Sequence, residues 1–136
     1  MAKETKEKEI LQYAVGRRKR AIARVRMYPG SGKILINEKP LESYVDSEAQ
    51  RVEFLKPVVQ AGMTDDHDFT VKVIGGGISG QLGAAQHGVA RCIAKVNDDM
   101  KSAMRNGGFL TRDPREKERK KVYHVRARKM PQFSKR

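Results

Sequence analysis

The chain has 136 residues, of which 29 are Lys or Arg and 16 are Asp or Glu, so its formal net charge is +13. This length suits one domain, and 38% hydrophobic residues are enough for one modest core. Because Cys92 is the single cysteine, an internal disulfide framework is excluded, and the positive surplus predicts a polyanionic partner, with nucleic acid favoured over an anionic membrane.

Residues 1–9 mix Lys and Glu and contain no apolar stretch. A signal peptide needs an apolar core and a transit peptide is poor in acidic residues, so neither is expected here. The sequence predicts a flexible leader over 1–9, a globular domain over 10–112 and an extended basic tail over 113–136.

Residues 13–28 predict strand structure, because the side chains of 21–28 alternate with a period of two. The Pro-Gly-Ser-Gly run at 29–32 predicts a turn and residues 33–37 predict a further strand, so the two runs are expected to form a β-hairpin. Arg24 and Arg26 fall on one face of such a strand, and that face would be basic.

Two helices are expected in the next segment. Residues 40–44 predict a short helix with a proline in its first turn. Ser47 and Gln50 form a capping-box pattern, which predicts a second helix that ends near Leu55, before Pro57.

The run 69–74 is apolar and β-branched, and it predicts a strand that leads into the glycine-rich segment 75–80. A long helix with one apolar stripe is expected from about residue 79 to 106, ended by two glycines. The cations on its opposite face, expected to be free to meet phosphates, are His87, Arg91, Lys95 and Arg105. The uncharged run 73–90 contains six glycines and is too polar for a membrane span.

Residues 109–110 predict a short strand, and the chain then becomes strongly basic. Residues 119–136 hold eight Lys or Arg, no acid and no amphipathic period, so they are expected to be extended, disordered alone and ordered on binding. Positive charge is concentrated at 13–33 (net +7) and 111–136 (net +8), whereas 34–68 carries net −5 and is expected to face solvent or a protein neighbour.

The glycines Gly75, Gly77 and Gly80 match the spacing of a dinucleotide-binding fingerprint. The acidic partner of such a site would be Asp98 or Asp99, but both lie inside the predicted helix, and the remaining chain is too short for a second βαβ unit. Two compatible interpretations stay open. The glycines permit a tight strand-to-helix turn, and the amides at the helix N-terminus can hold an RNA phosphate.

No catalytic residue, metal or cofactor is predicted. The three histidines, His67, His87 and His124, are too scattered to suggest a metal site with Cys92, which is expected to be a small residue near the core edge. No grouping of a nucleophile with a base is visible in the sequence.

Two further groups of residues point to nucleic acid. The basic cluster 17–20 matches a targeting signal in composition, but its position at the start of a strand favours fixed phosphate contacts. Tyr123 and Phe133 lie among cations, which suits stacking on bases, with anchoring of the tail on the protein as the alternative.

A set of short segments occurs in one order along the chain: 15–19, 23–25, 32–34, 36–37, 72–73, 75–81, 86–88, 108–113, 118–121 and 131–136. Together they resemble the small ribosomal subunit protein nine family of the bacterial and plastid type, over about residues 10–136. The closing Pro-Gln-Phe-Ser-Lys-Arg is the most specific segment. The leader 1–9 has no counterpart, and residues 122–130 are more apolar than the family pattern.

The resemblance implies an α/β (α+β) domain of the type shared with the second domain of small-subunit protein five. Such a domain has a mixed sheet of about four strands packed by helices, and a long extended C-terminal tail. The resemblance also implies a left-handed βαβ crossover, whereas the sequence alone favours the common right-handed form.

In function, the resemblance implies a non-enzymatic structural constituent of the small ribosomal subunit, in a bacterial cytoplasm or a plastid stroma. The implied partners are the 3′ major (head) domain of the rRNA, the peptidyl-site tRNA and neighbouring head proteins, with no membrane and no homo-oligomer. The residues expected to bind rRNA, from the resemblance or from their basic segments, are Arg17, Arg18, Lys19, Arg20, Arg24, Arg26, Lys33, Gly76, Gly77, Ser79, Arg112, Arg115, Arg119, Lys120, Lys121, Arg126, Arg128 and Lys129. Those expected to contact tRNA are Ser134, Lys135 and Arg136.

Two other functions are compatible with parts of the sequence. A free-standing nucleic-acid-compacting or RNA-chaperone module would carry the same basic segments, but it would be found free of ribosomes. A phosphate-handling enzyme that uses the loop 75–80 would bind ATP or NAD, and the lack of a catalytic grouping argues against it.

Overall fold

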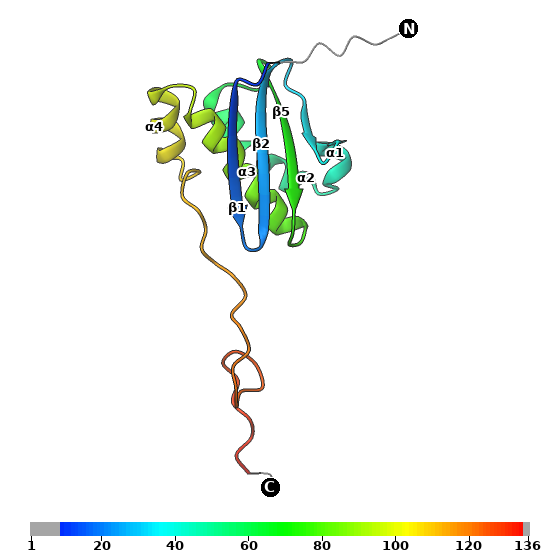
Figure 1. The fold of residues 1–136 in the computed structure, drawn as a ribbon, viewed down its shortest axis with the longest axis vertical. Coiled ribbons are helices and arrows are strands. Elements are labelled where there is room, and N and C mark those ends of the chain that lie inside the picture. Colours follow the sequence, from blue (N-terminus) through cyan, green and yellow to red (C-terminus); the bar gives the residue numbers. More distant parts are fainter. Residues whose placement is uncertain (1–8, 135–136) are drawn as a thin grey trace.

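The computed structural model describes residues 9–134 (Figure 1). Most of the predicted leader and two of the three predicted tRNA contacts, Lys135 and Arg136, lie outside the described residues.

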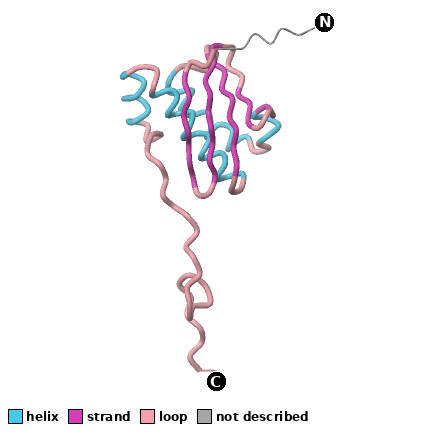
Figure 2. Tube along the Cα trace, viewed as in Figure 1, coloured by secondary structure: helices cyan, strands magenta, loops and turns pink. Residues whose placement is uncertain are grey.

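A five-stranded mixed sheet forms the centre of the domain, with the strand order β1-β2-β5-β3-β4 (Figure 2). β3 runs parallel to β5, and the other neighbouring pairs are antiparallel. The strands are β1 (Gln12–Arg18), β2 (Ala21–Pro29), β3 (Ile34–Ile36), β4 (Lys39–Pro40) and β5 (His67–Ile74). The predicted α+β class with a mixed sheet is confirmed, with five strands where about four were expected.

The predicted hairpin between residues 13–28 and 33–37 is wrong, because β5 lies between β2 and β3. The run 13–28 instead forms a hairpin of its own, in which β1 and β2 are joined by Lys19 and Arg20. The turn that follows β2 is held by Asp68, whose carboxylate accepts hydrogen bonds from two backbone N–H groups of the turn at 2.9 Å each. Alternation along a strand predicts its faces but does not identify the strand with which it pairs.

Two helices connect β4 to β5, namely α1 (Leu41–Tyr44) and α2 (Glu48–Ala61). α1 confirms the predicted short helix. Ser47 is the N-cap residue of α2, but its side chain makes no capping hydrogen bond, so the predicted capping box is not formed.

The prediction that this helix stops before Pro57 is also wrong. A proline inside a helix cannot donate to the carbonyl four residues earlier, which here belongs to Glu53. That carbonyl instead accepts a hydrogen bond of 2.6 Å from Nε2 of Gln86, which lies on another helix. α2 therefore continues through the proline and ends before Gly62, whose φ of 68° suits a glycine at a helix end.

The single long helix predicted for 79–106 is two helices, α3 (Ile78–Ala94) and α4 (Asp98–Asn106). Asn97 separates them, because its side-chain oxygen accepts a hydrogen bond of 2.8 Å from the backbone N–H of Met100 and so caps α4. The apolar stripe continues across the break, which is why periodicity alone predicts one helix. No helix in the described part of the chain is long and apolar enough to span a membrane.

The two glycines after α4 end it as predicted. The predicted strand at 109–110 is not formed. The N–H of Phe109 bonds back to the carbonyl of Met104 at 3.1 Å, so this segment finishes the helix end instead.

The helices cover one face of the sheet, with α2 and α3 behind it in Figure 1, and no helix of residues 9–134 covers the opposite face. Inward side chains such as Val25 and Phe69 form the core with Val89 and Ile93 of α3. Cys92, expected near the core edge, is fully buried within this core.

α3 packs directly on the backbone of β1. A Cβ at Gly16 would lie 2.0 Å from the carbonyl oxygen of Ala84 and 2.3 Å from the nitrogen of Gly88. These two glycines permit a close approach that no other residue at position 16 would allow.

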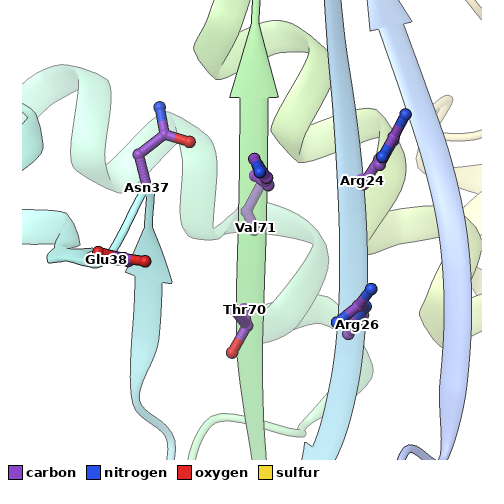
Figure 3. A pocket seen from close by; sticks show the side chains of 7 residues that line it. Arg24, Arg26, Asn37, Glu38, Thr70 and Val71 are labelled. Atoms are coloured by element: carbon purple, nitrogen blue, oxygen red, sulfur yellow. The ribbon is translucent and has the colours of Figure 1, made fainter.

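The parallel pair β3 and β5 is joined through β4, α1 and α2. In Figure 3 both strands point upward, the strand that leads to Asn37 lies to the left of β5, and the connecting helices lie behind the sheet. A connection that passes behind the sheet and returns on the right is a left-handed crossover, as the resemblance implied.

Candidate nucleic-acid interface

The uncovered face of the sheet is cationic, and we call it the open sheet face. Arg17 of β1, Arg24 and Arg26 of β2, and Lys72 of β5 are exposed. Arg24, Arg26 and Lys72 each lie between two buried neighbours, and Arg17 lies between a buried glycine and a partly buried arginine. Arg24 lies directly opposite Lys72 in the β2–β5 register, a placement of like charges that destabilises a sheet. Within residues 9–134, none of these four side chains forms an ion pair.

A shallow hollow of about 490 Å³ lies on this face (Figure 3). Arg24 and Arg26 border it on one side of β5, and the turn of Asn37 and Glu38 borders it on the other. The Asn37 amide fixes that turn, because its oxygen accepts from the N–H of Val73 at 2.9 Å and its nitrogen donates to the Val73 carbonyl at 3.2 Å. The hollow is therefore a preformed surface in which cations outnumber the one carboxylate.

Lys72 is the cation that sequence reasoning missed as a site residue. Its exposed position in β5 follows from alternation, but its place beside Arg24 depends on the pairing of β5 with β2. The predicted hairpin pairs β2 with residues 33–37, so it places no cation of β5 beside Arg24.

The glycine-rich loop lies beside the basic turn between β1 and β2. Gly75 and Gly76 have φ values of 79° and 65°, and a Cβ at Gly75 would lie 2.7 Å from the Arg20 carbonyl oxygen. A Cβ at Gly80 would lie 3.6 Å from the side chain of Lys19. The side chain of Lys19 therefore lies beside the first turn of α3, where the helix dipole is positive, and this arrangement suits an anion.

This geometry bears on both open interpretations of the loop. The positive φ values of Gly75 and Gly76 and the close approach at Gly75 show that these two glycines are needed for the strand-to-helix turn, whereas a Cβ at Gly77 would meet nothing within 4 Å. Gly76, Gly77 and Ser79 are exposed, so phosphate binding at the same place is compatible with that role. Asp98 and Asp99 lie in the first turn of α4 and not at the end of a strand, which does not fit a dinucleotide site.

Arg18 is engaged within the protein. Its guanidinium lies 3.6 Å from the carboxylate of Asp113, and its side chain covers Gly83 of α3. Arg115 also binds Asp113, with distances of 3.0 Å from Nε and 2.7 Å from a terminal nitrogen. Hydrogen bonds from Arg115 hold the pKa of the Asp113 carboxyl well below its usual range, so this ionised group fixes the beginning of the tail.

Two exposed cations on the face of α3 that is predicted to meet phosphates also bond to the backbone of β1. Arg91 donates to the carbonyl of Val15, and Lys95 donates to that of Tyr13 at 2.6 Å. β1 is an edge strand, and these bonds provide hydrogen-bond donors for two backbone carbonyls on its outer side that no neighbouring strand reaches.

His87 completes this edge and connects it to the tail. Its Nδ1 accepts from the N–H of Arg17 at 3.4 Å, so its Nε2 donates to the carbonyl of Leu110 at 3.2 Å. Partial burial lowers the pKa of His87, and the charges of Arg91 and Arg112 lower it further. The hydrogen bond to Leu110 acts in the opposite direction and only partly offsets these effects. A neutral imidazole is the form that makes both bonds.

The tail runs away from the domain with no helix or strand over residues 111–134 (Figure 1). Most of its predicted rRNA contacts are exposed and make no ion pair within the described residues, namely Arg112, Arg119, Lys120, Arg126 and Lys129. Lys121 and Arg128 both pair with Glu118. Tyr123 and Phe133 are 87% and 103% exposed, so neither anchors the tail on the protein.

The remaining predicted cations, Lys19, Arg20 and Lys33, and the predicted tRNA contact Ser134 are also exposed. No group of three or more His, Cys, Asp or Glu is placed to hold a metal ion within residues 9–134. Burial raises the pKa of the Cys92 thiol to about 12, so it stays protonated and unreactive.

A small α+β domain with an uncovered cationic sheet face and a basic tail is typical of a nucleic-acid-binding protein. The ribosomal protein S9/S16 family matches this chain over residues 16–136, and the chain belongs to that family. It is therefore an RNA-binding protein of the ribosome that functions in translation, and the predicted resemblance is confirmed.

Proposed function

We propose that the chain is a structural constituent of the small ribosomal subunit whose domain binds the 3′ major (head) domain of the rRNA. The observation that carries this proposal is the group of cations on the open sheet face, which form no ion pair with any other residue of 9–134. Arg24 and Lys72 repel each other in the free protein, and a phosphate between them would relieve that repulsion. The family match supports the same conclusion, since ribosomal proteins are generally non-enzymatic and bind rRNA.

Phosphate neutralisation is the main source of affinity in this account. Each phosphate that a Lys or Arg neutralises releases counterions, so binding weakens steeply as salt is raised. The Arg side chains of the open sheet face suit bidentate contacts with phosphate, whereas Lys72 and Lys33 act as point charges. The turn of Lys19 and Arg20 adds a second anion site at the N-terminus of α3.

The two arginines bound to Asp113 have a different role in this account. Arg18 and Arg115 hold the first residues of the tail against the domain, and so they set the direction in which the tail leaves. Arg112 and the basic residues of 119–129 then follow the rRNA beyond the reach of the folded domain.

The end of the tail, with Ser134, Lys135 and Arg136, is proposed to contact the backbone of the peptidyl-site tRNA. The support is that the tail beyond its anchor at Asp113 projects from the domain without packing on it (Figure 1), and that residues 119–136 contain no acid. An irregular chain delivers cations into a site that is too crowded for a folded domain, and its contacts offset the entropy lost when it orders.

The test is to delete residues 134–136 and measure tRNA dissociation from isolated small subunits. Subunit assembly should persist, because the domain is untouched, and peptidyl-site tRNA should dissociate faster. A matched control is Lys56→Ala, which removes a cation from α2 on the helical side of the domain. This variant should leave the rate of tRNA dissociation unchanged. Equal tRNA retention by the truncated and full-length chains would overturn the tail assignment.

A further inference from the structure

The tail contains a closed loop between residues 118 and 129, visible as a coil in the lower part of the tail in Figure 1. Glu118 closes it through two contacts, one with Lys121 and one with Nε of Arg128 at 2.9 Å. Within the loop, the N–H of Val125 donates to the carbonyl of Lys129 at 2.8 Å. The tail is therefore not uniformly extended, and we call this segment the tail loop.

Tyr123 occupies an unusual position in the tail loop. Its φ is 63°, in the left-handed region that bulky side chains rarely adopt, and its side chain is 87% exposed. An exposed ring makes no packing contact that would offset the cost of this strained backbone conformation. Strain of this kind often marks a functional residue. The loop holds the ring away from its own residues and towards a partner.

The surroundings of Tyr123 are cationic. Arg119, Lys120 and Arg126 belong to the same loop, are exposed and form no ion pair within the described residues. Glu118 is the one carboxylate of the loop, and both its oxygens are occupied by cations. Hydrogen bonds from Lys121 and Arg128 lower the pKa of Glu118, so it stays ionised and the loop stays closed at neutral pH.

We infer that the tail loop is a preformed RNA-binding element in which Tyr123 stacks on an unpaired base while the loop cations neutralise the flanking phosphates. Single-stranded or bulged RNA presents bases to aromatic rings, and an exposed ring among cations matches that chemistry. The inference rests on the proposed function and deepens it, since it names the kind of rRNA feature that this segment binds.

The first test uses the full chain and a transcript of the small-subunit head rRNA, with affinity measured over a series of salt concentrations. Tyr123→Gly removes the ring while relaxing the positive φ, so the loop keeps its shape and the loss reports stacking. Affinity should fall by roughly fivefold to a hundredfold, the range for one lost base–aromatic stack, with an unchanged salt slope. Tyr123→Phe should bind like the parent chain.

Lys120→Ala is the matched charge variant. It should weaken binding and also lower the salt slope by about one, which distinguishes a phosphate contact from a stack. If Tyr123→Gly binds as tightly as the parent chain, the stacking inference is wrong while the proposed function stands. If the parent chain itself does not bind the head transcript, the proposed function fails.

A second measurement reports the environment of the ring directly. The chain has no tryptophan, so Tyr123→Trp introduces a single tryptophan into the tail loop, whose emission can be excited selectively at wavelengths that tyrosine does not absorb. Its emission should be quenched when the head transcript binds, whereas Val52→Trp on the exposed side of α2 should not respond. Binding without quenching, or quenching that requires added head proteins, would show a ring that does not stack on RNA and would overturn the inference.

Glu118→Gln tests the loop closure. A simple charge account predicts tighter RNA binding for this variant, because one negative charge is removed. Closure by Glu118 predicts the opposite, namely weaker binding, and reduced quenching of the introduced tryptophan in a chain that combines Glu118→Gln with Tyr123→Trp. Tighter binding with full quenching would show that the closed loop is not needed.

Discussion

His87 shows how one side chain can join separate parts of this molecule. Its two ring nitrogens connect the backbone of β1 at Arg17 with the backbone at Leu110, where the tail begins. Protonation at Nδ1 would remove the acceptor for the Arg17 N–H and place a charge beside Arg91 and Arg112. The pH dependence of stability is therefore expected to report on this residue.

We predict that the free energy of unfolding falls as the pH is lowered from about 7 to 5. The pKa of His87 is lowered in the folded state, so the unfolded chain, with a histidine pKa of about 6.5, binds more protons in this window. Its contribution is complete above that value and is lost as the pH falls. Urea unfolding at several pH values measures this, and His87→Gln should flatten the dependence over this window.

His124→Gln is the control, because His124 lies in the tail outside the folded domain. It should retain the parent pH dependence. A parent chain whose stability stays constant from pH 7 to 5 would contradict the role given to His87.

At the residue scale, the sequence predicted which cations are exposed better than it predicted their partners. Arg24 and Arg26 were placed on one basic face by alternation alone, and the structure confirms this. The engagement of Arg18 by Asp113 could not be foreseen, because the two residues are far apart along the chain. Which cations remain free is decided by tertiary contacts that periodicity does not encode.

At the scale of elements, helix ends depended on single hydrogen bonds. The bond from Gln86 to the Glu53 carbonyl lets α2 pass Pro57, and the cap by Asn97 divides a stretch whose apolar pattern is continuous. Strand positions were predictable from alternation, but the insertion of β5 between β2 and β3 is a long-range choice. Local patterns therefore predicted the elements better than their ends and neighbours.

The two cap residues Asn97 and Ser47 make a direct comparison possible. Asn97→Ala should lower the free energy of unfolding by about 1 kcal/mol, because it removes the acceptor for the Met100 N–H. Ser47→Ala should have little effect, since the Ser47 side chain makes no capping bond. Urea denaturation of the two variants measures the difference, and equal losses would contradict the assignment of the caps.

At the scale of the whole molecule, the charge of +13 is divided between two structures with different tasks. The open sheet face and the adjoining glycine loop present fixed cations on a rigid domain. The tail carries net +8 over residues 111–136 and leaves the domain at an anchor made by Asp113, Arg18 and Arg115. Most of the acidic segment 34–68 lies in α1, α2 and the turns around them.

The most direct test of this account is co-sedimentation with small ribosomal subunits through a high-salt wash. The parent chain should remain with the small subunit. A chain with Arg24→Ala and Lys72→Ala should be released at lower salt, because it lacks the two cations between which a phosphate is proposed to bind. The Lys56→Ala chain should behave like the parent. Recovery of the parent chain mainly free of ribosomes, or release of the double variant at the same salt as the parent, would contradict the central claim.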